Sequence, residues 1–541
     1  MEKKKKMKVA TNLFLAAGVL ASSAGIVHAA EVKPQTSTTT SEKRLLRLNM
    51  PDGIYTADPA LAEDASSIAL VRATFDGLTR VGPDGKIQLS VAQKIDVSDD
   101  LKTYTIYLRD TKWSNGDPVT AGDFEYAWKR MLDPEKGSNY AYMLYYLQNA
   151  EKANLGTLGL DKVGVTAVDA KTLKVTLEQP APFFTELLTL PSYYPVNKKV
   201  VEANPLWAEN ASTHVGNGPF TIETWTRQEK LVLVKNKYYW DNAAVKLDRL
   251  DFTMIRGENE ELTLFEEGKL DWAGAPLNAL PVEAKSALKQ KGLLQKQPIA
   301  GVYWYKFNTE QQPFTNVKIR RAFAYAINRQ ELVDSLLDSV QYPAMGLVPL
   351  TTSLKKEGYF KDNDKETAKK LLAEGMKELG LTKLPPISLS FNQSDAHRVI
   401  AETIQKQWKD SLGVDVALED KEWKVHLDDM RDGQYQIGRM GWVGDLNDPI
   451  NYLELFKDKY GDLNDTYWAN SKYQELLNQS ATEKDPEKRK QLLAAAEAII
   501  MDEMPVVPIY FFTSQWVQKK ELKGVVMDGL GNIDYKWAHK E

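Results

Sequence analysis

A change in hydrophobic periodicity near residue 305 limits the fold of this chain more than any other feature of its sequence. Before that point, alternating segments such as "TYTIYLRD" at 103–110 and two runs within 163–180 predict antiparallel strands joined by tight turns. Beyond it, helix-like periods at 317–338 and 365–379 alternate with short strand-like runs. Such alternation is typical of crossover connections, so we expect an α/β chain whose first half contains mixed or antiparallel sheet.

Two further segments carry strong local signals. The run from Phe220 to Lys235 alternates on both sides of a turn at 227–230, which predicts a hairpin. Asp485-Pro-Glu487 places a capping aspartate before a proline at the first helical position, which predicts a helix from there to about Met501.

The length and the cysteine content limit what the chain can be. A chain of 541 residues is too long for one hydrophobic core, so we expect two or three domains. It contains no cysteine, which excludes disulfides, thiolate catalysis and zinc–thiolate sites.

The first 29 residues have the pattern of an export signal. Lysines at 3–6 and 8 precede a mostly apolar stretch from Val9 to Val27, and Val27-His-Ala29 offers a cleavage site. Cleavage there leaves 64 basic and 73 acidic side chains, a net charge of −9. A mildly acidic protein without a cationic face is not expected to bind nucleic acid.

Leu20-Ala-Ser-Ser23 resembles a bacterial lipoprotein signal in which Ser23 replaces the lipid-bearing cysteine. Chance occurrence in a region rich in alanine and serine is the other interpretation. Because a serine cannot form the thioether anchor, we expect a cleaved extracytoplasmic protein without lipid, in the periplasm, at the cell surface or secreted. The polar residues that follow, 30–43, predict a flexible leader.

The usual signatures of catalysis are missing from the sequence. It has no HExxH, GxSxG, GxxxxGK[ST] or GxGxxG motif and only five histidines. Two of them, His397 and His426, have nearby aspartates, but exposed positions at helix ends explain these pairs better than a metal site does. We expect no cofactor, no metal and no enzymatic activity, with a secreted hydrolase as the alternative.

Four long blocks resemble the family-5 extracytoplasmic solute-binding proteins, the oligopeptide-binding subunits of ABC importers, and the resemblance runs from about residue 45 to the C-terminus. The blocks are Ala92 to Pro134, Gly216 to Asn242, Val302 to Arg329 and "GWVGDLNDP" at 441–449.

The resemblance implies a two-lobed fold of the periplasmic-binding-protein type II, in the large class that carries an extra subdomain. The two lobes are expected to be joined by a hinge and to close around a ligand. The expected boundaries are 1–29 for the signal peptide, 30–43 for the leader, 44–78, 206–305 and 510–541 for lobe I, 79–205 for its extra subdomain, and 306–509 for lobe II.

The resemblance also suggests a role for Asp445, which follows an apolar run. In the family, a carboxylate at this position pairs with the α-ammonium group of the bound peptide, and such a pair is strong in a site with little water. The alternative is an aspartate that caps the turn in "GDLND". For the nearby Asp448, the capping interpretation is kept.

Two basic residues resemble those that hold the ligand's carboxylate end. Arg439 corresponds to the residue used for shorter peptides and suits the task because its planar fork is always charged. His397 corresponds to the residue reached by longer peptides, with a surface position at a helix start as the alternative. Arg431 is a weaker candidate that could be solvated instead.

Several aromatic residues and one glycine complete the expected site. Strand alternation puts Tyr303 and Tyr305 on one face and Trp304 on the other, so all three cannot line a cleft. The tyrosines at 139–147 could reach the ligand or pack in a core. The remaining expected contacts are the side chains of Trp423 and Trp442, as walls, and the backbone at Gly441-Trp442.

The resemblance implies a protein that binds its ligand without altering it chemically. We expect a monomeric receptor that binds oligopeptides in extended form between two lobes and delivers them to a membrane-embedded ABC permease. A receptor for dipeptides, cell-wall peptides or signalling peptides is the alternative of the same fold.

Overall fold

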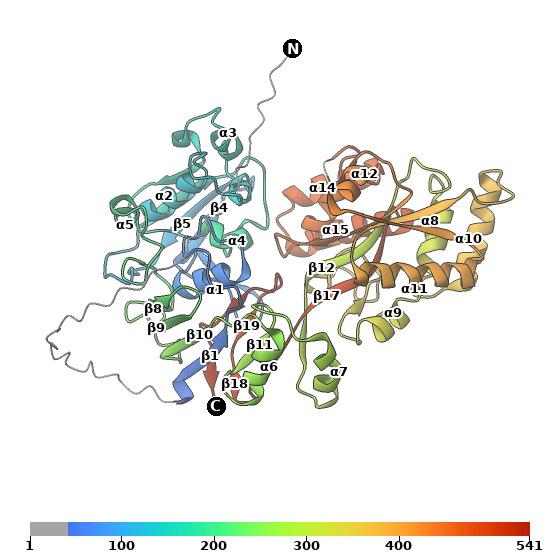
Figure 1. Cartoon of the computed structure of the whole chain (residues 1–541). Coiled ribbons are helices and arrows are strands. Elements are labelled where there is room, and N and C mark those ends of the chain that lie inside the picture. Colours follow the sequence, from blue (N-terminus) through green and yellow to red (C-terminus); the bar gives the residue numbers. More distant parts are fainter. Residues whose placement is uncertain (1–41, 462) are drawn as a thin grey trace, which may run out of the picture. The chain divides into compact units, whose positions relative to one another are not determined.

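The computed structural model describes residues 42–461 and 463–541 (Figure 1). The predicted signal peptide, its cleavage site, Ser23 and the leader up to residue 41 lie outside the described residues. A search of the described part of the chain for a helix able to cross a membrane found none.

A four-stranded sheet contains the first strand of the described chain. It has the order β1-β10-β9-β8, with β1 parallel to β10 and the other neighbours antiparallel. The predicted hairpin at 220–235 is confirmed as β8 and β9. The strands are β1 (Leu45–Asn49), β8 (Phe220–Thr226), β9 (Lys230–Lys235) and β10 (Arg249–Thr253).

A second four-stranded sheet, entirely antiparallel, lies within residues 92–176, in the order β4-β5-β7-β6. The alternation that predicted strands here has a physical basis, since Tyr104, Ile106 and Leu108 are buried in the core while their neighbours are less so. Its strands are β4 (Ala92–Val97), β5 (Thr103–Leu108), β6 (Val165–Ala167) and β7 (Thr172–Thr176), and the short pair β2 (Thr79–Val81) and β3 (Ile87–Leu89) precedes them.

The largest sheet runs in the order β11-β17-β12-β16-β14-β15, and the short β13 also pairs with β17. The long strands β12 and β17 lie side by side at its centre (Figure 1). The expected domain boundaries at 305/306 and 509/510 fall inside these two strands. The strands are β11 (Trp272–Gly274), β12 (Gln295–Phe307), β13 (Tyr342–Pro343), β14 (Ile387–Asn392), β15 (Val416–Lys421), β16 (Ile437–Val443) and β17 (Val506–Gln518).

Helices cover these sheets. Those before β12 are α1 (Ala65–Thr74), α2 (Ala121–Met131), α3 (Ala150–Asn154), α4 (Phe184–Leu187), α5 (Lys198–Ala203), α6 (Glu258–Glu266) and α7 (Val282–Gln290). Those after it are α8 (Val317–Tyr325), α9 (Arg329–Leu336), α10 (Lys365–Glu378), α11 (Asp395–Leu412), α12 (Trp423–Arg431), α13 (Ile450–Leu453), α14 (Ser471–Thr482) and α15 (Pro486–Glu503). The chain ends in two short strand pairs, β18 (Leu522–Lys523) with β21 (His539–Lys540) and β19 (Val526–Met527) with β20 (Ile533–Asp534).

Local capping explains two of the helix boundaries. Asp485 accepts hydrogen bonds from the N–H groups of Glu487 and Lys488, so the predicted start of α15 is confirmed. The helix-like period expected over 317–338 is present as two helices instead of one, because Asn328 interrupts it. That residue has non-helical dihedral angles and caps α9 by accepting from the N–H of Glu331, which divides the segment into α8 and α9.

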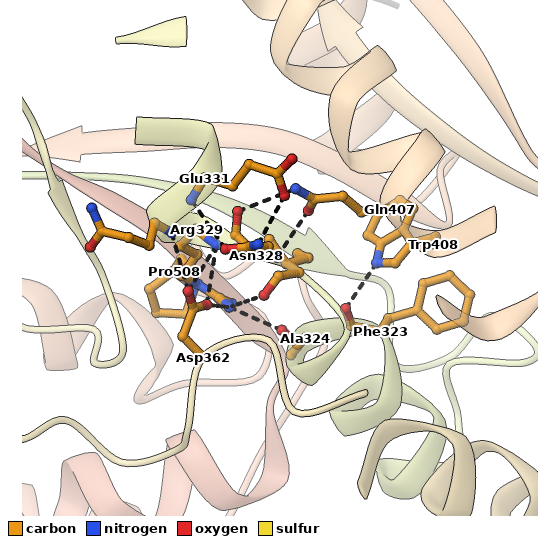
Figure 2. Close-up of polar contacts among 11 residues, drawn as sticks. Phe323, Ala324, Asn328, Arg329, Glu331, Asp362, Gln407, Trp408 and Pro508 are labelled. Atoms are coloured by element: carbon orange, nitrogen blue, oxygen red, sulfur yellow. Dashed lines mark hydrogen bonds and ion pairs between the residues drawn. The ribbon is translucent and has the colours of Figure 1, made fainter. Parts of the chain in front are cut away.

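The break between α8 and α9 also places a buried arginine in the core (Figure 2). Arg329 is fully buried, and its guanidinium donates to the carbonyl of Pro508 on β17 at 2.8 Å and to that of Ala324 on α8 at 3.1 Å. It also pairs with Asp362 at 3.1 Å. One cation therefore links a helix turn, a loop and the central strand of the sheet.

Replacing Arg329 with methionine should destabilise the protein strongly. The change leaves Asp362 without its cation and two carbonyls without a donor, and removal of one member of a buried pair typically costs about 3–5 kcal/mol. Urea denaturation followed by circular dichroism measures the loss in the free energy of unfolding.

Lys318→Met is the matched control. Lys318 pairs with Glu374 and Glu378 at the surface, where ion pairs contribute about 0–1 kcal/mol. Equal losses in the two variants contradict the role given to Arg329.

Candidate functional site

Along one edge of strand β16, only the first two residues pair with another strand of the described chain. On one side β16 pairs with β12 along its whole length, from Ile437 to Val443. On the other side its pairing with β14 is confined to Ile437 and Gly438. Among the residues that the structure describes, the segment 439–443 therefore has one edge that is not occupied by a strand.

Hydrogen bonds at the two ends of the ladder show which backbone groups point to β12. The N–H of Gly444 donates to the carbonyl of Ala300 at 2.7 Å, and that of Asn308 donates to the carbonyl of Gln436 at 3.0 Å. In an antiparallel pair, successive residues direct their backbone groups to alternate sides. Even-numbered residues of β16 therefore bond to β12, and odd-numbered residues face the open edge.

The open edge thus belongs to Arg439, Gly441 and Val443. The carbonyl of Arg439 is taken by the ring Nε2 of His426 at 2.8 Å. Gly441 directs its N–H and C=O toward the open edge, whereas the backbone of Trp442 faces β12. Of the two residues expected to place their backbone beside a peptide, only Gly441 faces the open edge. The next residue that does so is Val443.

Asp445 lies in the loop that directly follows β16. It is half-buried, and burial raises the pKa of its carboxyl group, while the nearby hydroxyl of Tyr142 acts in the opposite direction. Its own N–H donates to Oδ1 of Asn451 at 3.2 Å. Across residues 42–461 and 463–541, its carboxylate has no cationic partner and caps no backbone N–H.

Asp448, three residues further on, has a different environment. Its Oδ1 accepts from the N–H of Ile450 at 2.9 Å, which confirms the capping interpretation. The same carboxylate makes a two-point ion pair with Arg489 at 2.7 and 2.8 Å. Within one loop, therefore, one aspartate is fully paired and the other is not.

Two cavities meet at Asp445. One of about 630 Å³ is lined by Asp445, Tyr142, Tyr146 and Phe183 among others. The other, of about 560 Å³, shares Asp445 and Tyr142 and adds Trp442. Tyr142 belongs to the tyrosine run at 139–147 and is 42% exposed, so this tyrosine reaches the candidate site instead of packing in a core.

Arg439 projects from β16 and contacts Tyr303 and Asn392. Its guanidinium carbon lies 4.5 Å from the centre of the Tyr303 ring, and Nη1 donates to Oδ1 of Asn392 at 3.1 Å. Its Nε is buried without a hydrogen-bond partner in the described part of the chain. This guanidinium, like the Asp445 carboxylate, has no partner of opposite charge among the described residues.

His397, in the first turn of α11, belongs to the same cluster. Its Nδ1 lies 3.4 Å from the hydroxyl of Tyr303. Burial and the neighbouring Arg439 lower the pKa of His397 to about 4, so the ring is neutral at pH 7. Tyr303 and Tyr305 are fully buried beneath it and form the floor of the cluster, with Tyr303 stacked on Tyr510 at 4.8 Å.

The other aromatic candidates lie apart from this cluster. Trp304 points to the opposite face of β12 and packs on Phe456, as its alternation predicts. Trp442 donates from Nε1 to the same Asn451 oxygen that accepts from Asp445. Trp423 begins α12, is 45% exposed and lies 6.2 Å, centre to centre, from the ring of His426, the residue that donates to the Arg439 carbonyl.

The structure also shows the surroundings of Arg431 and His426. Arg431 is exposed and paired with Asp428 and Asp432, which fits the solvated interpretation. The expectation that His426 is an exposed residue at a helix end is wrong, because its side chain is fully buried. Its spacing of four residues from the buried Met430 could have indicated an inward-facing position.

Within residues 42–461 and 463–541, an open strand edge lies between a carboxylate and a guanidinium that have no partners of opposite charge, and this suits a protein that holds a zwitterionic, extended ligand. Comparison with known proteins agrees with a binding protein. Residues 86–464 match the family described as bacterial extracellular solute-binding proteins, family 5. The chain belongs to this family, and its predicted α/β fold class is confirmed.

Individual relatives span nearly the whole chain. The oligopeptide-binding protein OppA of Bacillus subtilis is 52% identical, over 92% of this chain and 93% of the relative. The dipeptide-binding protein DppE of the same organism is 38% identical over 93% of each.

Solved structures show the same fold. The unliganded open form of the periplasmic murein tripeptide-binding protein MppA has a TM-score of 0.86 and 31% identity, covering 94% of this chain and 99% of its own. Listeria monocytogenes OppA bound to peptide has a TM-score of 0.65 and 30% identity, covering 92% and 99%.

Asp445→Asn should not destabilise the ligand-free protein at neutral pH. Because the folded-state pKa of Asp445 is raised, the folded protein binds a proton there more tightly than the unfolded chain does. The wild type therefore gains stability as pH falls toward the ordinary aspartate pKa of 3.8. We expect the variant to melt at the same or a higher temperature near pH 7, and this difference to shrink in acid, as measured by scanning calorimetry.

Asp448→Asn is the control from the same loop. It leaves the buried Arg489 without its anion and should lower the melting temperature. If the two variants lose equal stability, Asp445 is a structural residue like Asp448.

Proposed function

We propose that this protein is an extracytoplasmic receptor that binds oligopeptides in extended conformation and supplies them to an ABC permease for uptake. The observation that carries the proposal is the open edge of β16, which runs from the unpaired guanidinium of Arg439 toward the unpaired carboxylate of Asp445. Relatives named for oligopeptide binding, and a peptide-bound structure of one of them, support it.

The chemistry of the edge explains how many sequences could be accepted. An added strand bonds through its own N–H and C=O groups, which are the same in every peptide. Gly441 and Val443 offer such groups, and Gly441 has no side chain to obstruct a neighbour. Asp445 supplies a counter-ion for the α-ammonium group and so fixes where the peptide begins.

The carboxylate end is proposed to reach the Arg439 cluster. Arg439 can hold a carboxylate in two-point fashion, and His397 lies beside it for a longer peptide. Tyr303 and Tyr305 support these groups from below. Trp442 and the exposed Trp423 are proposed as walls for ligand side chains.

The division into lobes is part of the same proposal. Residues 44–78, 206–305 and 510–541 would form lobe I, with 79–205 as its subdomain, and 306–509 would form lobe II. β12 and β17, which contain both crossing points, would act as the hinge. The membrane partner and the monomeric state also belong to the proposal.

Location outside the cytoplasm follows from the family, and Ser23 in place of a cysteine would leave the protein without a lipid anchor. The family consists of solute-binding proteins, so the ligand should be released chemically unchanged.

Asp445→Ala should weaken peptide binding severely. Truncating one member of a desolvated charge pair costs about 2–5 kcal/mol, roughly 30-fold to several thousand-fold in affinity. Isothermal titration calorimetry with trialanine and tetra-alanine measures the loss. N-acetylation removes the ammonium group and should weaken binding to the wild type for the same reason.

Asp415→Ala, at an exposed surface pair with Lys409 within the proposed lobe II, is the control and should bind normally. Tight binding of free peptides by Asp445→Ala contradicts the assignment of the ammonium site. Mass spectrometry of the recovered peptide tests whether it is intact, and cleaved peptide would favour a hydrolase.

Binding of tetra-alanine should also take up a proton at His397. A carboxylate beside this ring favours the imidazolium and raises its pKa from about 4. Affinity should therefore rise as pH falls from about 7 to about 5.5. Calorimetry in buffers of different ionisation enthalpy counts the protons bound.

His397→Gln keeps the polar side chain but cannot titrate, and should abolish both the rise and the proton uptake. Protonation of Asp445 would weaken binding, so it cannot imitate the effect. An unchanged pH dependence in His397→Gln removes His397 from the carboxylate site.

A further inference from the structure

His426 is a buried polar residue that the proposed binding scheme does not use. It projects from α12 into the space where β14 separates from β16, and its side chain is fully buried. Its Nε2 lies 2.8 Å from the carbonyl oxygen of Arg439, and its Nδ1 lies 3.0 Å from Oγ of Ser390 on β14. One imidazole therefore connects the two diverging strands.

The geometry selects one tautomer of this ring. A backbone carbonyl can only accept, so the proton must be on Nε2, and Nδ1 then accepts from the hydroxyl of Ser390. Burial lowers the pKa of His426, which keeps the ring in this neutral form. Both ring nitrogens are satisfied, so the side chain has one orientation.

The position of α12 leaves little freedom at this point. A Cβ added at Gly438, the last residue of β16 that pairs with β14, would lie 2.0 Å from Sδ of Met430. Met430 and His426 are four residues apart on α12 and both face β16. The helix therefore packs directly on the strand where the ladder ends, and His426 provides the next hydrogen bond.

That hydrogen bond occupies the first outward-facing carbonyl of the open edge. Without a donor, the Arg439 carbonyl would be a partly buried acceptor without a partner next to a separating strand, and the segment could shift to pair with β14 or take in water. The side chain of the same residue is held by Asn392 at the end of β14. Both contacts fix Arg439 relative to Gly441 and Val443.

We propose that His426 is a positioning residue for ligand binding. By holding the Arg439 carbonyl, it keeps the edge at Gly441 and Val443 free for a ligand backbone and aims the Arg439 guanidinium at the ligand's carboxylate. The inference rests on the proposed peptide-binding function and assigns His426 no direct contact with the ligand.

The test compares donors of different geometry at position 426. Gln can place its amide nitrogen near the position of Nε2, whereas Leu fills similar space without a donor. His426→Leu should lose about tenfold in affinity for trialanine, the effect of one buried carbonyl left unsatisfied. His426→Gln should recover most of this affinity. Ser390→Ala removes only the hydrogen bond to Nδ1 of His426 and should show a smaller loss of affinity.

Two readouts separate positioning from stability. Calorimetry is performed well below the melting temperature of each variant, so that a stability change alone does not alter the affinity of folded protein. The penalty for N-acetylation should stay at its wild-type value in His426→Leu, because Asp445 is untouched. The preference between trialanine and tetra-alanine should change, because Arg439 moves.

His214→Leu is the matched control. This histidine is also buried, but it packs against Phe75 and Trp207 in another part of the chain, so its loss can lower stability without altering affinity. If His426→Leu has wild-type affinity, or if the Leu and Gln variants lose equal affinity, the inference about His426 is overturned and the proposed function is not affected. If the wild type binds neither peptide, the proposed function fails and the inference fails with it.

Discussion

Every backbone N–H and C=O group needs a hydrogen-bond partner. The effect of this requirement is clearest where the pairing of β14 with β16 ends. Strand β14 stops pairing after Gly438, while β16 continues for five residues beside β12. The groups that face away from β12 must then bond to side chains, to water or to a ligand. His426 takes the first of them, and the next ones are left available. The proposed binding site is thus a consequence of where one strand leaves another.

Deeply buried charges in this structure are either paired with an opposite charge or, as at Arg320, Glu261 and Glu497, satisfied by several protein hydrogen bonds. A charge without such partners in a region of low dielectric constant is costly. Examples of paired charges are Lys306 with Asp465, Arg329 with Asp362, Arg72 with Asp528 and Arg489 with Asp448. Asp445 and Arg439 depart from this pattern among the described residues, and they lie six positions apart in sequence. Two incompletely paired groups of opposite sign fit a ligand that carries both charges.

Much of this arrangement could be predicted from patterns in the chain. Hairpins followed from alternation, the start of α15 from its Asp-Pro signal, and the family from four long blocks of residues. The errors concern residues whose surroundings are supplied by distant segments. Asn328 divides a helical period, and its backbone N–H and C=O both bond to the side chain of Gln407 on α11. His426 is buried because β14 and β16 separate next to it, and no local pattern reports that separation.

The amino-acid sequence by itself determined the class of fold, the absence of thiol chemistry and the identity of the charged residues from which a site could be built. These depend on periodicity, composition and short motifs, which are properties of neighbouring residues. Only the tertiary structure decided which aspartate of the loop after β16 is paired, which backbone groups of β16 are open, and that Tyr142 and Asp445 meet although some three hundred residues separate them. Pairing and exposure depend on contacts between distant segments, and those contacts exist only once the chain is folded.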